Sequence, residues 1–150
     1  MTRAPESADP RWATYPDTIV EIFTSPLLRV DLRHPLPTDL ATRLRGLGLG
    51  DAWSVITAHN PGRMLSESEN ERRERDLWRR AESSGAAFLR ADGVNPDGTD
   101  REVGVAIALA REGSIALAAE FGQSATFWFD GACFWLDPAL VGDRPIRLPA

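Results

Sequence analysis

The segment Ala52–Asn70, AWSVITAHNPGRMLSESEN, constrains the fold more than any other part of the chain. In its first part, Ala52–Ala58, the residues that would point to either side of a strand are mostly apolar. This pattern predicts a strand that is covered on both sides. The Asn-Pro-Gly sequence that follows is typical of a sharp turn. Ser66 and Glu69 then form the S-x-x-E pattern of a capping box, which predicts the start of a helix. The segment therefore places polar side chains where a strand ends and a helix begins, a common position for ligand sites.

The region before this segment predicts a hairpin and a short helix. Thr18–Thr24 and Leu27–Arg33 each alternate apolar and polar residues, and the Ser-Pro sequence between them indicates a turn. Thr38–Leu44 is predicted to be a short helix with Thr38 as its N-cap, ended by the glycines that begin at Gly46.

From the Ala52 strand onward, the pattern predicts the order β-α-β-β-α-β with one added strand. The predicted helices are Ser66–Ser84 and Ser114–Phe121, and the further strands are Ala86–Ala91, Glu102–Leu109, Ala125–Phe129 and Ala132–Leu136. The last two strands are predicted to form a hairpin around Asp130-Gly131. This order is that of a ferredoxin-like core, for which right-handed crossovers restrict the sheet order to 4-1-3-2. The predicted fold is therefore α+β with a mainly antiparallel sheet, extended by the N-terminal hairpin and a C-terminal strand.

The length of 150 residues suits one domain. Residues 1–16 are polar and contain proline, so they are predicted to be a flexible arm. The single α+β domain is predicted over residues 17–137, and residues 138–150 form an extended tail.

Composition limits the kinds of partner. A net charge of −5 argues against a general nucleic-acid binder, which usually carries a basic face. No apolar run approaches the roughly 20 residues that span a bilayer, so no membrane partner is expected. The N-terminus has no apolar segment of the secretory kind, and the single cysteine, Cys133, fits a reducing compartment. The sequence therefore predicts a cytoplasmic protein.

The predicted topology brings polar residues from distant segments to one edge of the sheet. Four polar residues that are far apart in the sequence each lie near the start or end of an element at this edge. They are Asn60, Asn70, Glu102 and Gln123. Asn70 also lies at the start of an apolar helix stripe, where an amide without hydrogen-bond partners costs roughly 1–3 kcal/mol. Two interpretations stay open for Asn70, a structural clasp to the Asn-Pro-Gly turn and a direct ligand contact.

Several of these residues form a pattern that resembles a known family. The matching positions are Thr57, Ala58, Asn60, Pro61, Ser66, Glu69, Asn70, Arg73, Glu102, Phe121, Gly122, Gln123 and Ala125. They resemble the Thr-Ala-x-Asn-Pro, Ser-x-x-Glu-Asn and Phe-Gly-Gln-x-Ala motifs of the bacterial domain of unknown function 3293 family. The resemblance spans about Tyr15 to Leu136, and His59 stands where the family pattern has tryptophan. The family implies no activity, so function has to be argued from the residues.

The candidate site combines one carboxylate with amides and arginines. Glu102 is the candidate general base, and His59 beside it offers an acid–base pair, although a single side chain on a turn is more often only polar and exposed. The candidate ligand-binding residues are Thr57, His59, Asn60, Arg63, Asn70, Arg73 and Gln123. Arginines at a helix N-terminus suit an anionic group. With two histidines and one cysteine, no metal or cofactor is expected.

The leading hypothesis is a small domain that binds a polar or anionic small molecule, such as a metabolite or a nucleotide-like ligand. The alternative is a non-catalytic protein-interaction domain in which the same polar residues are structural. The residues leave open whether any reaction is catalysed.

Overall fold

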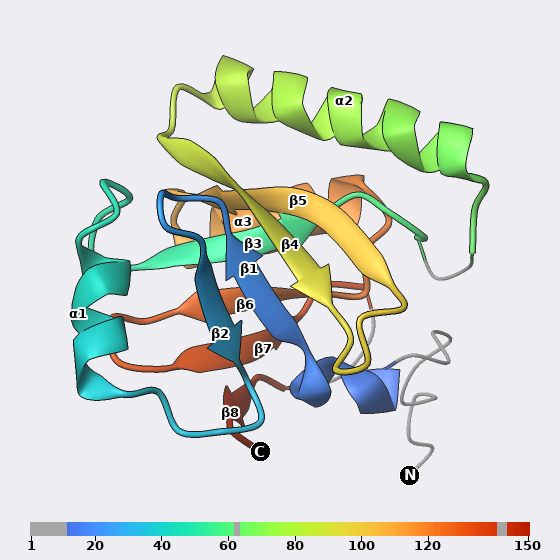
Figure 1. Cartoon of the computed structure of the whole chain (residues 1–150). Helices are drawn as coiled ribbons and strands as arrows, with labels where there is room; N and C mark the ends of the chain where they lie inside the picture. The colour runs from blue at the N-terminus through green and yellow to red at the C-terminus, as the bar shows by residue number, and fades with distance from the viewer. Residues whose placement is uncertain (1–11, 62–63, 141–143) are drawn as a thin grey trace, which may run out of the picture.

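The strands of the chain form one curled antiparallel sheet in the order β2-β1-β4-β5-β3-β6-β7-β8 (Figure 1). The computed structural model describes residues 12–61, 64–140 and 144–150. The strands are β1 (Ile19–Ile22), β2 (Leu28–Asp31), β3 (Trp53–Thr57), β4 (Phe88–Val94), β5 (Arg101–Ile107), β6 (Ala125–Phe129), β7 (Phe134–Pro138) and β8 (Ile146–Leu148). β3 lies in the interior of the sheet, between β5 and β6, so its residues are placed by pairing on both sides.

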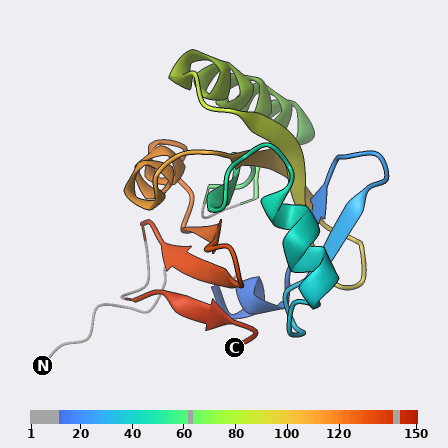
Figure 2. The same ribbon diagram turned by 90° about the vertical axis from the view of Figure 1, so that its left-hand side faces the viewer.

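Two helices cover one face of this sheet. α2 (Glu67–Ser84) and α3 (Arg111–Glu120) both pack on the outer face of β3 and β5 (Figures 1 and 2). Leu77 of α2 and Leu117 of α3 share one apolar cluster with Ile56 of β3. The even-numbered side chains of β3 therefore face the helices, and the odd-numbered ones face the interior of the curl.

Within the described ranges, each helix is too short or too polar to cross a membrane.

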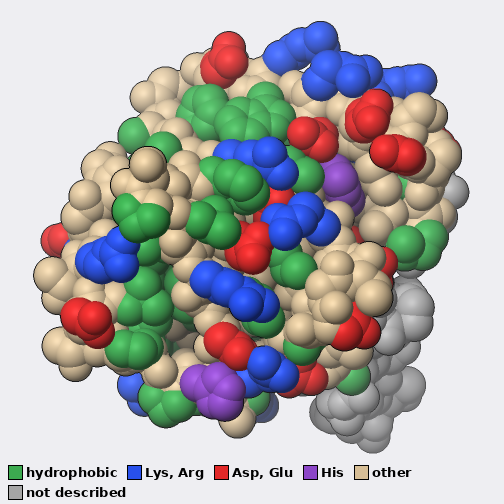
Figure 3. All heavy atoms as spheres, in the orientation of Figure 1, with side chains coloured by type: hydrophobic (Ala, Val, Ile, Leu, Met, Phe, Trp, Pro, Cys, Tyr) green, Lys and Arg blue, Asp and Glu red, His purple; other side chains and the backbone are tan. Residues whose placement is uncertain are grey.

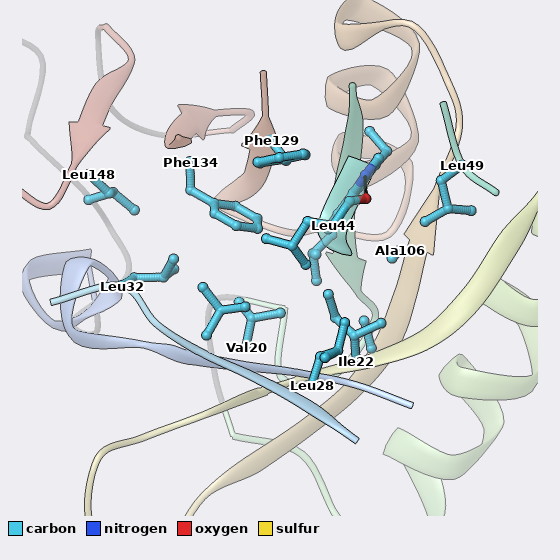
Figure 4. Packing of buried hydrophobic residues seen from close by; sticks show 14 of the residues in the cluster. Val20, Ile22, Leu28, Leu32, Leu44, Leu49, Ala106, Phe129, Phe134 and Leu148 are labelled. Atoms are coloured by element: carbon cyan, nitrogen blue, oxygen red, sulfur yellow. Dashed lines mark hydrogen bonds between the residues drawn. The ribbon is translucent and has the colours of Figure 1, made fainter. Parts of the chain in front are cut away.

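The inner face of the curl holds a second apolar cluster. Val20 and Leu28 of the first two strands lie in the same cluster as Phe129 and Phe134 of β6 and β7, so the two halves of the sheet pack against each other (Figure 4). α1 (Thr38–Arg45) fills one end of this interior with Leu44, which is fully buried. The Trp53 indole Nε1 donates to the Leu44 carbonyl oxygen at 3.2 Å and ties the start of β3 to α1.

The strongest local signals in the sequence are confirmed. Ser66 is the N-cap of α2, and Ser66 and Glu69 satisfy each other's backbone N–H groups as a capping box. β1 and β2 pair as the predicted hairpin, and so do β6 and β7 around Asp130-Gly131.

Thr38 is not the N-cap of α1. That position belongs to Pro37, whose carbonyl oxygen accepts the Ala41 N–H at 2.9 Å. This hydrogen bond already makes Thr38 the first helical residue. α3 also begins earlier than predicted, at Arg111, because the Arg111 guanidinium makes two hydrogen bonds of 2.8 and 2.7 Å to the buried Asp137 carboxylate. A contact between distant segments thus starts this helix, in place of a local capping side chain.

The hairpin of β4 and β5 is longer than the sequence predicts. Its register runs from Phe88↔Ile107 to Val94↔Arg101, so Asp92–Val94 belong to β4, beyond the predicted end of the strand at Ala91. The Asp92 carboxylate is fully buried and accepts hydrogen bonds from Arg90 and Arg101, which stabilises this extension.

The described parts of the predicted arm and tail contain regular structure. Trp12–Asp17 forms the 3₁₀ helix η1, whose Trp12 and Tyr15 pack against the inner cluster. The remaining part of the predicted arm, residues 1–11, lies outside the described residues. β8, in the predicted tail, pairs antiparallel with β7.

Candidate functional site

A pocket of about 440 Å³ opens at the end of the curl opposite α1. Its lining comes from segments far apart in the sequence, namely η1, the hairpin of β4 and β5, the end of β3, and the strands β6 and β7. Val55, Phe127 and Leu136 make an apolar wall, and Thr57, Glu102 and Gln123 lie along the same lining. The pocket therefore has an apolar side and a hydrogen-bonding side.

Glu102 is held in place by two neighbouring side chains. The Thr57 hydroxyl lies 3.3 Å from Glu102 Oε1, and the Asn60 amide Nδ2 donates to Glu102 Oε2 at 3.2 Å. Thr57 is paired in register with Gly104, where a Cβ atom would lie 2.1 Å from the Ile56 carbonyl oxygen. Only glycine allows the two strands to approach this closely, which brings Glu102 within reach of β3.

Gln123 joins the same network from the other side of β3. Its Oε1 atom lies 3.1 Å from the Thr57 hydroxyl, and its Nε2 atom donates to the His59 carbonyl oxygen at 3.0 Å. Gly122 allows this arrangement because its φ is +71° and a Cβ atom there would lie 2.8 Å from Pro61 Cβ. The clustering of Asn60, Glu102 and Gln123 predicted from the topology is therefore observed.

Asn70 forms a structural clasp to the Asn-Pro-Gly turn, which is one of the two interpretations left open by the sequence. Its Oδ1 accepts the Asn60 backbone N–H at 2.9 Å, and its Nδ2 donates to Asn60 Oδ1 at 3.0 Å. Asn60 Oδ1 also accepts the Leu65 N–H at 2.9 Å. Asn60 has a φ of +48°, a left-handed conformation that asparagine tolerates better than most residues. The clasp thus holds the turn in the shape that points the Asn60 amide at Glu102.

Arg73 contacts two backbone carbonyl oxygens, and His59 contacts a carboxylate of α2. Arg73 Nε donates to the Ala58 carbonyl oxygen at 2.5 Å, and its Nη2 donates to the Phe121 carbonyl oxygen. His59 Nε2 lies 3.2 Å from Glu74 Oε2 on α2, so the carboxylate beside the imidazole is that of Glu74. β3 ends at Thr57, so the alternation of the strand does not extend to His59, and its ring turns toward α2. The candidate residue Arg63 lies outside the described residues.

Several pocket residues had no sequence signal of their own. Tyr15 and Asp17 reach the pocket from η1, within the predicted arm, and Asp100 comes from the turn between β4 and β5. The apolar wall could have been found, because Val55 alternates with Thr57 along one strand face. Across the described ranges, no group of histidine, cysteine and carboxylate side chains is placed to hold a metal ion.

The fold and the site define a mixed α/β protein with an antiparallel curled sheet and a pocket whose rim is polar. Residues 56–126 match the family model described as "Protein of unknown function (DUF3293)", so this segment of the chain is similar to that family. The resemblance predicted from the motifs is therefore confirmed. The matched residues include Thr57, Asn60, Asn70, Glu102 and Gln123, the whole hydrogen-bonded network described above. Comparison with curated proteins gave no match, and neither did comparison with solved structures.

Proposed function

We propose that this protein binds a polar small molecule in the pocket at the Thr57 end of β3. The observation that carries the proposal is the pocket itself, about 440 Å³ with an apolar wall and a few convergent polar groups. Small-molecule sites are typically clefts of roughly 300–1,000 Å³ with this combination, and the mouth of a curled sheet is a common place for them.

The polar groups are also oriented before any ligand arrives. Thr57 and Asn60 each hold one oxygen of Glu102, and Asn70 in turn holds Asn60. Such supporting hydrogen bonds are what a binding site needs to present its groups at a low entropic cost. Thr57, Asn60 and Gln123 are proposed as ligand contacts, and any reaction in this pocket would use Glu102 as its general base.

The central part of the sheet supports a finer description of the fold. We propose that β3, α2, β4, β5, α3 and β6 form a ferredoxin-like unit. The four strands are adjacent in the order β4-β5-β3-β6, and each neighbouring pair is antiparallel. α2 and α3 pack on the same face of these strands, as such a unit requires.

A screen of metabolites by thermal unfolding of the full chain tests the binding proposal. A true ligand raises the stability by RT ln(1 + [L]/Kd), about 2.7 kcal/mol at a hundredfold excess over Kd. The matched variant is Gly93→Val. Gly93 lines the pocket opposite Glu102 in register, and a Cβ atom there would meet only ordinary contact, with Thr18 Cγ2 at 3.7 Å.

The valine should fill part of the pocket and abolish stabilisation by the ligand. The control is Gly113→Ala on α3, where a Cβ atom meets Leu109 Cβ at 3.9 Å, away from the pocket. If no compound stabilises the protein, or if Gly93→Val responds as strongly as the control, the small-molecule proposal is wrong. The protein-interaction alternative is then the hypothesis that is left.

A further inference from the structure

The polar side of the pocket has more hydrogen-bond acceptors than protons to share among them. The Thr57 hydroxyl lies 3.3 Å from Glu102 Oε1 and 3.1 Å from Gln123 Oε1. A threonine hydroxyl carries a single proton, whereas a carboxylate oxygen and an amide oxygen both act as acceptors. The proton of Thr57 can therefore make a well-aligned hydrogen bond to one of these oxygens at a time.

The orientation of the Gln123 amide is set by two backbone carbonyl groups. Its Nε2 donates to the His59 carbonyl oxygen at 3.0 Å and to the Phe121 carbonyl oxygen at 3.4 Å. Carbonyl oxygens only accept, so the nitrogen end of the amide faces them and the oxygen end faces Thr57. Turning the amide over would place its oxygen against two other oxygens. Gln123 Oε1 is thus fixed as an acceptor in the pocket lining.

Glu102 and Gln123 differ in how far they depend on the Thr57 proton. Glu102 also accepts a hydrogen bond from Asn60 Nδ2 at 3.2 Å. Within the described residues, Thr57 is the hydrogen-bond donor to Gln123 Oε1, and Gln123 is only 5% exposed, so little water reaches it. When the Thr57 proton bonds to Glu102, Gln123 Oε1 is left without a donor. A buried acceptor in that state costs roughly 1–3 kcal/mol.

The charges at the exposed rim do not select one sign of ligand charge. Asp17, Asp100 and Arg101 all line the pocket there. Arg101 Nη1 donates to Asp92 at 2.7 Å, and its Nη2 lies 2.7 Å from Glu21 Oε1. Figure 3 likewise shows acidic and basic side chains next to one another in the middle of that face. Selection of a ligand therefore rests on the hydrogen bonds inside the pocket and on its apolar wall.

The apolar wall suits a compact apolar body. Val55, Phe127 and Leu136 come from three strands of the inner face, and Tyr15 lines the pocket from η1. Apolar and aromatic side chains contribute affinity in proportion to the apolar area that a ligand buries against them. A pocket of about 440 Å³ has room for a body of one or two rings.

We infer that the pocket takes a compact, mainly apolar molecule whose N–H or O–H group donates to Gln123 Oε1. The inference rests on the proposed function and names its ligand class. The body lies along Val55 and Phe127, and the donor lies at Gln123. The Thr57 proton then stays with Glu102, so each of the competing oxygens has a donor. The ligand completes the hydrogen-bonded network and breaks none of the bonds that hold the site in shape.

Two probes of one shape test this inference. Indole carries an N–H group, and benzofuran has an oxygen atom without a hydrogen in its place. Each is titrated into the full chain, and binding is followed by the amide NMR shifts of Thr57, Gln123 and Phe127. Indole should bind about fivefold more tightly than benzofuran, because benzofuran leaves the Gln123 oxygen without a donor.

Variants then locate the preference. Thr57→Val removes the competing hydroxyl, so Gln123 Oε1 depends on the ligand alone and the preference for indole should rise about threefold. Thr126→Val is the matched control, because Thr126 precedes Phe127 on β6 and points to the opposite face of the sheet. It should leave the preference within about twofold. Gln123→Met removes the acceptor and should abolish the preference. If that variant does not fold, because Nε2 also holds the His59 carbonyl oxygen, Thr57→Val decides.

The inference is overturned if benzofuran binds as tightly as indole, if neither probe binds, or if Thr57→Val leaves the preference unchanged or lowers it. These results are distinct from failure of the proposed function. That function fails only when the metabolite screen yields no ligand whose effect Gly93→Val removes. A metabolite from that screen without an N–H or O–H donor would keep the pocket as a binding site and reject the donor at Gln123.

Discussion

At the Trp53 end of β3, side chains of α1 fill the space inside the curled sheet, whereas at the Thr57 end the same space is a pocket of about 440 Å³. Leu44 and Trp53 are both fully buried in the inner apolar cluster at the filled end, and the Trp53 indole donates to the Leu44 carbonyl oxygen. At the open end, Thr57, Asn60 and Glu102 are joined by hydrogen bonds.

The comparison shows two ways of stabilising one strand. The filled end excludes water and gains the transfer free energy of its apolar side chains. The open end keeps a cavity, so its turns and strands depend on polar contacts that also form the candidate site. Stability and binding should therefore be separable at the filled end and coupled in the hydrogen-bonded residues of the open end.

The largest effect is expected from Leu44→Ala at the filled end. Removing a fully buried leucine side chain leaves a cavity and should lower the free energy of unfolding by about 2–5 kcal/mol. Urea unfolding measures this change. Leu27→Ala is the control, because Leu27 is 45% exposed and should cost less than about 0.5 kcal/mol. The amide NMR shifts of the pocket residues should stay unchanged in the folded variant. Loss of those shifts would show that the two ends are not separable.

Asn70→Ala tests the clasp at the open end. It leaves the Asn60 backbone N–H without its partner and should cost about 1–3 kcal/mol. Because Asn60 orients Glu102, the variant should also weaken binding of any pocket ligand. Asn70→Asp keeps the acceptor and loses the donor to Asn60 Oδ1, so it should also be less stable than the wild type. A stable Asn70→Ala protein with unchanged binding would contradict coupling at this end.

Ser66→Ala removes the N-cap acceptor of α2 and should destabilise the protein by about 0.5–2 kcal/mol. Denaturant unfolding measures the change, with Ser83→Ala in the same helix as the control. Ser83 is exposed near the other helix end, and its loss should stay within about 0.5 kcal/mol. Pocket binding should survive Ser66→Ala. If stability holds and binding is lost, Ser66 belongs to the site.

The smallest change in stability is expected for Gly93→Val. Valine suits a strand better than glycine, and the added Cβ atom meets no close contact, so the free energy of unfolding should change by less than about 1 kcal/mol. Thermal unfolding without ligand checks this. A large destabilisation would mean that the pocket wall is packed more tightly than the structure shows, and the comparison of the two ends would lose its basis.

The sequence predicted the helices and strands that are determined by interactions within a few residues. The apolar run of β3 and the capping box at Ser66 each act within a few residues, and both elements begin within one residue of the prediction. The start of α3 and the extension of β4 were missed. Both depend on ion pairs between distant segments, Arg111 with Asp137 and Asp92 with Arg101.

The candidate site was predicted only in part, again because some of its contacts join segments that are distant in the sequence. Chain topology was enough to expect Asn60, Glu102 and Gln123 in one neighbourhood, and the structure places them there. It was not enough to assign His59, because the choice between Glu102 and Glu74 depends on which face of the sheet the ring occupies. It also gave no role to Tyr15, which reaches the pocket from a short helix without a clear sequence pattern.

By itself, the sequence determined the strand, turn and helix of Ala52–Asn70, the hairpins at both ends of the chain, and the family resemblance of residues 56–126. These follow from local propensity, turn chemistry and motif spacing, which act over short stretches. Only the tertiary structure decided that the sheet curls, that α1 fills one end, and that a pocket remains at Glu102. The reason is physical, since an interior space depends on how side chains from β1, β3, β6 and η1 meet, and no single segment contains that information.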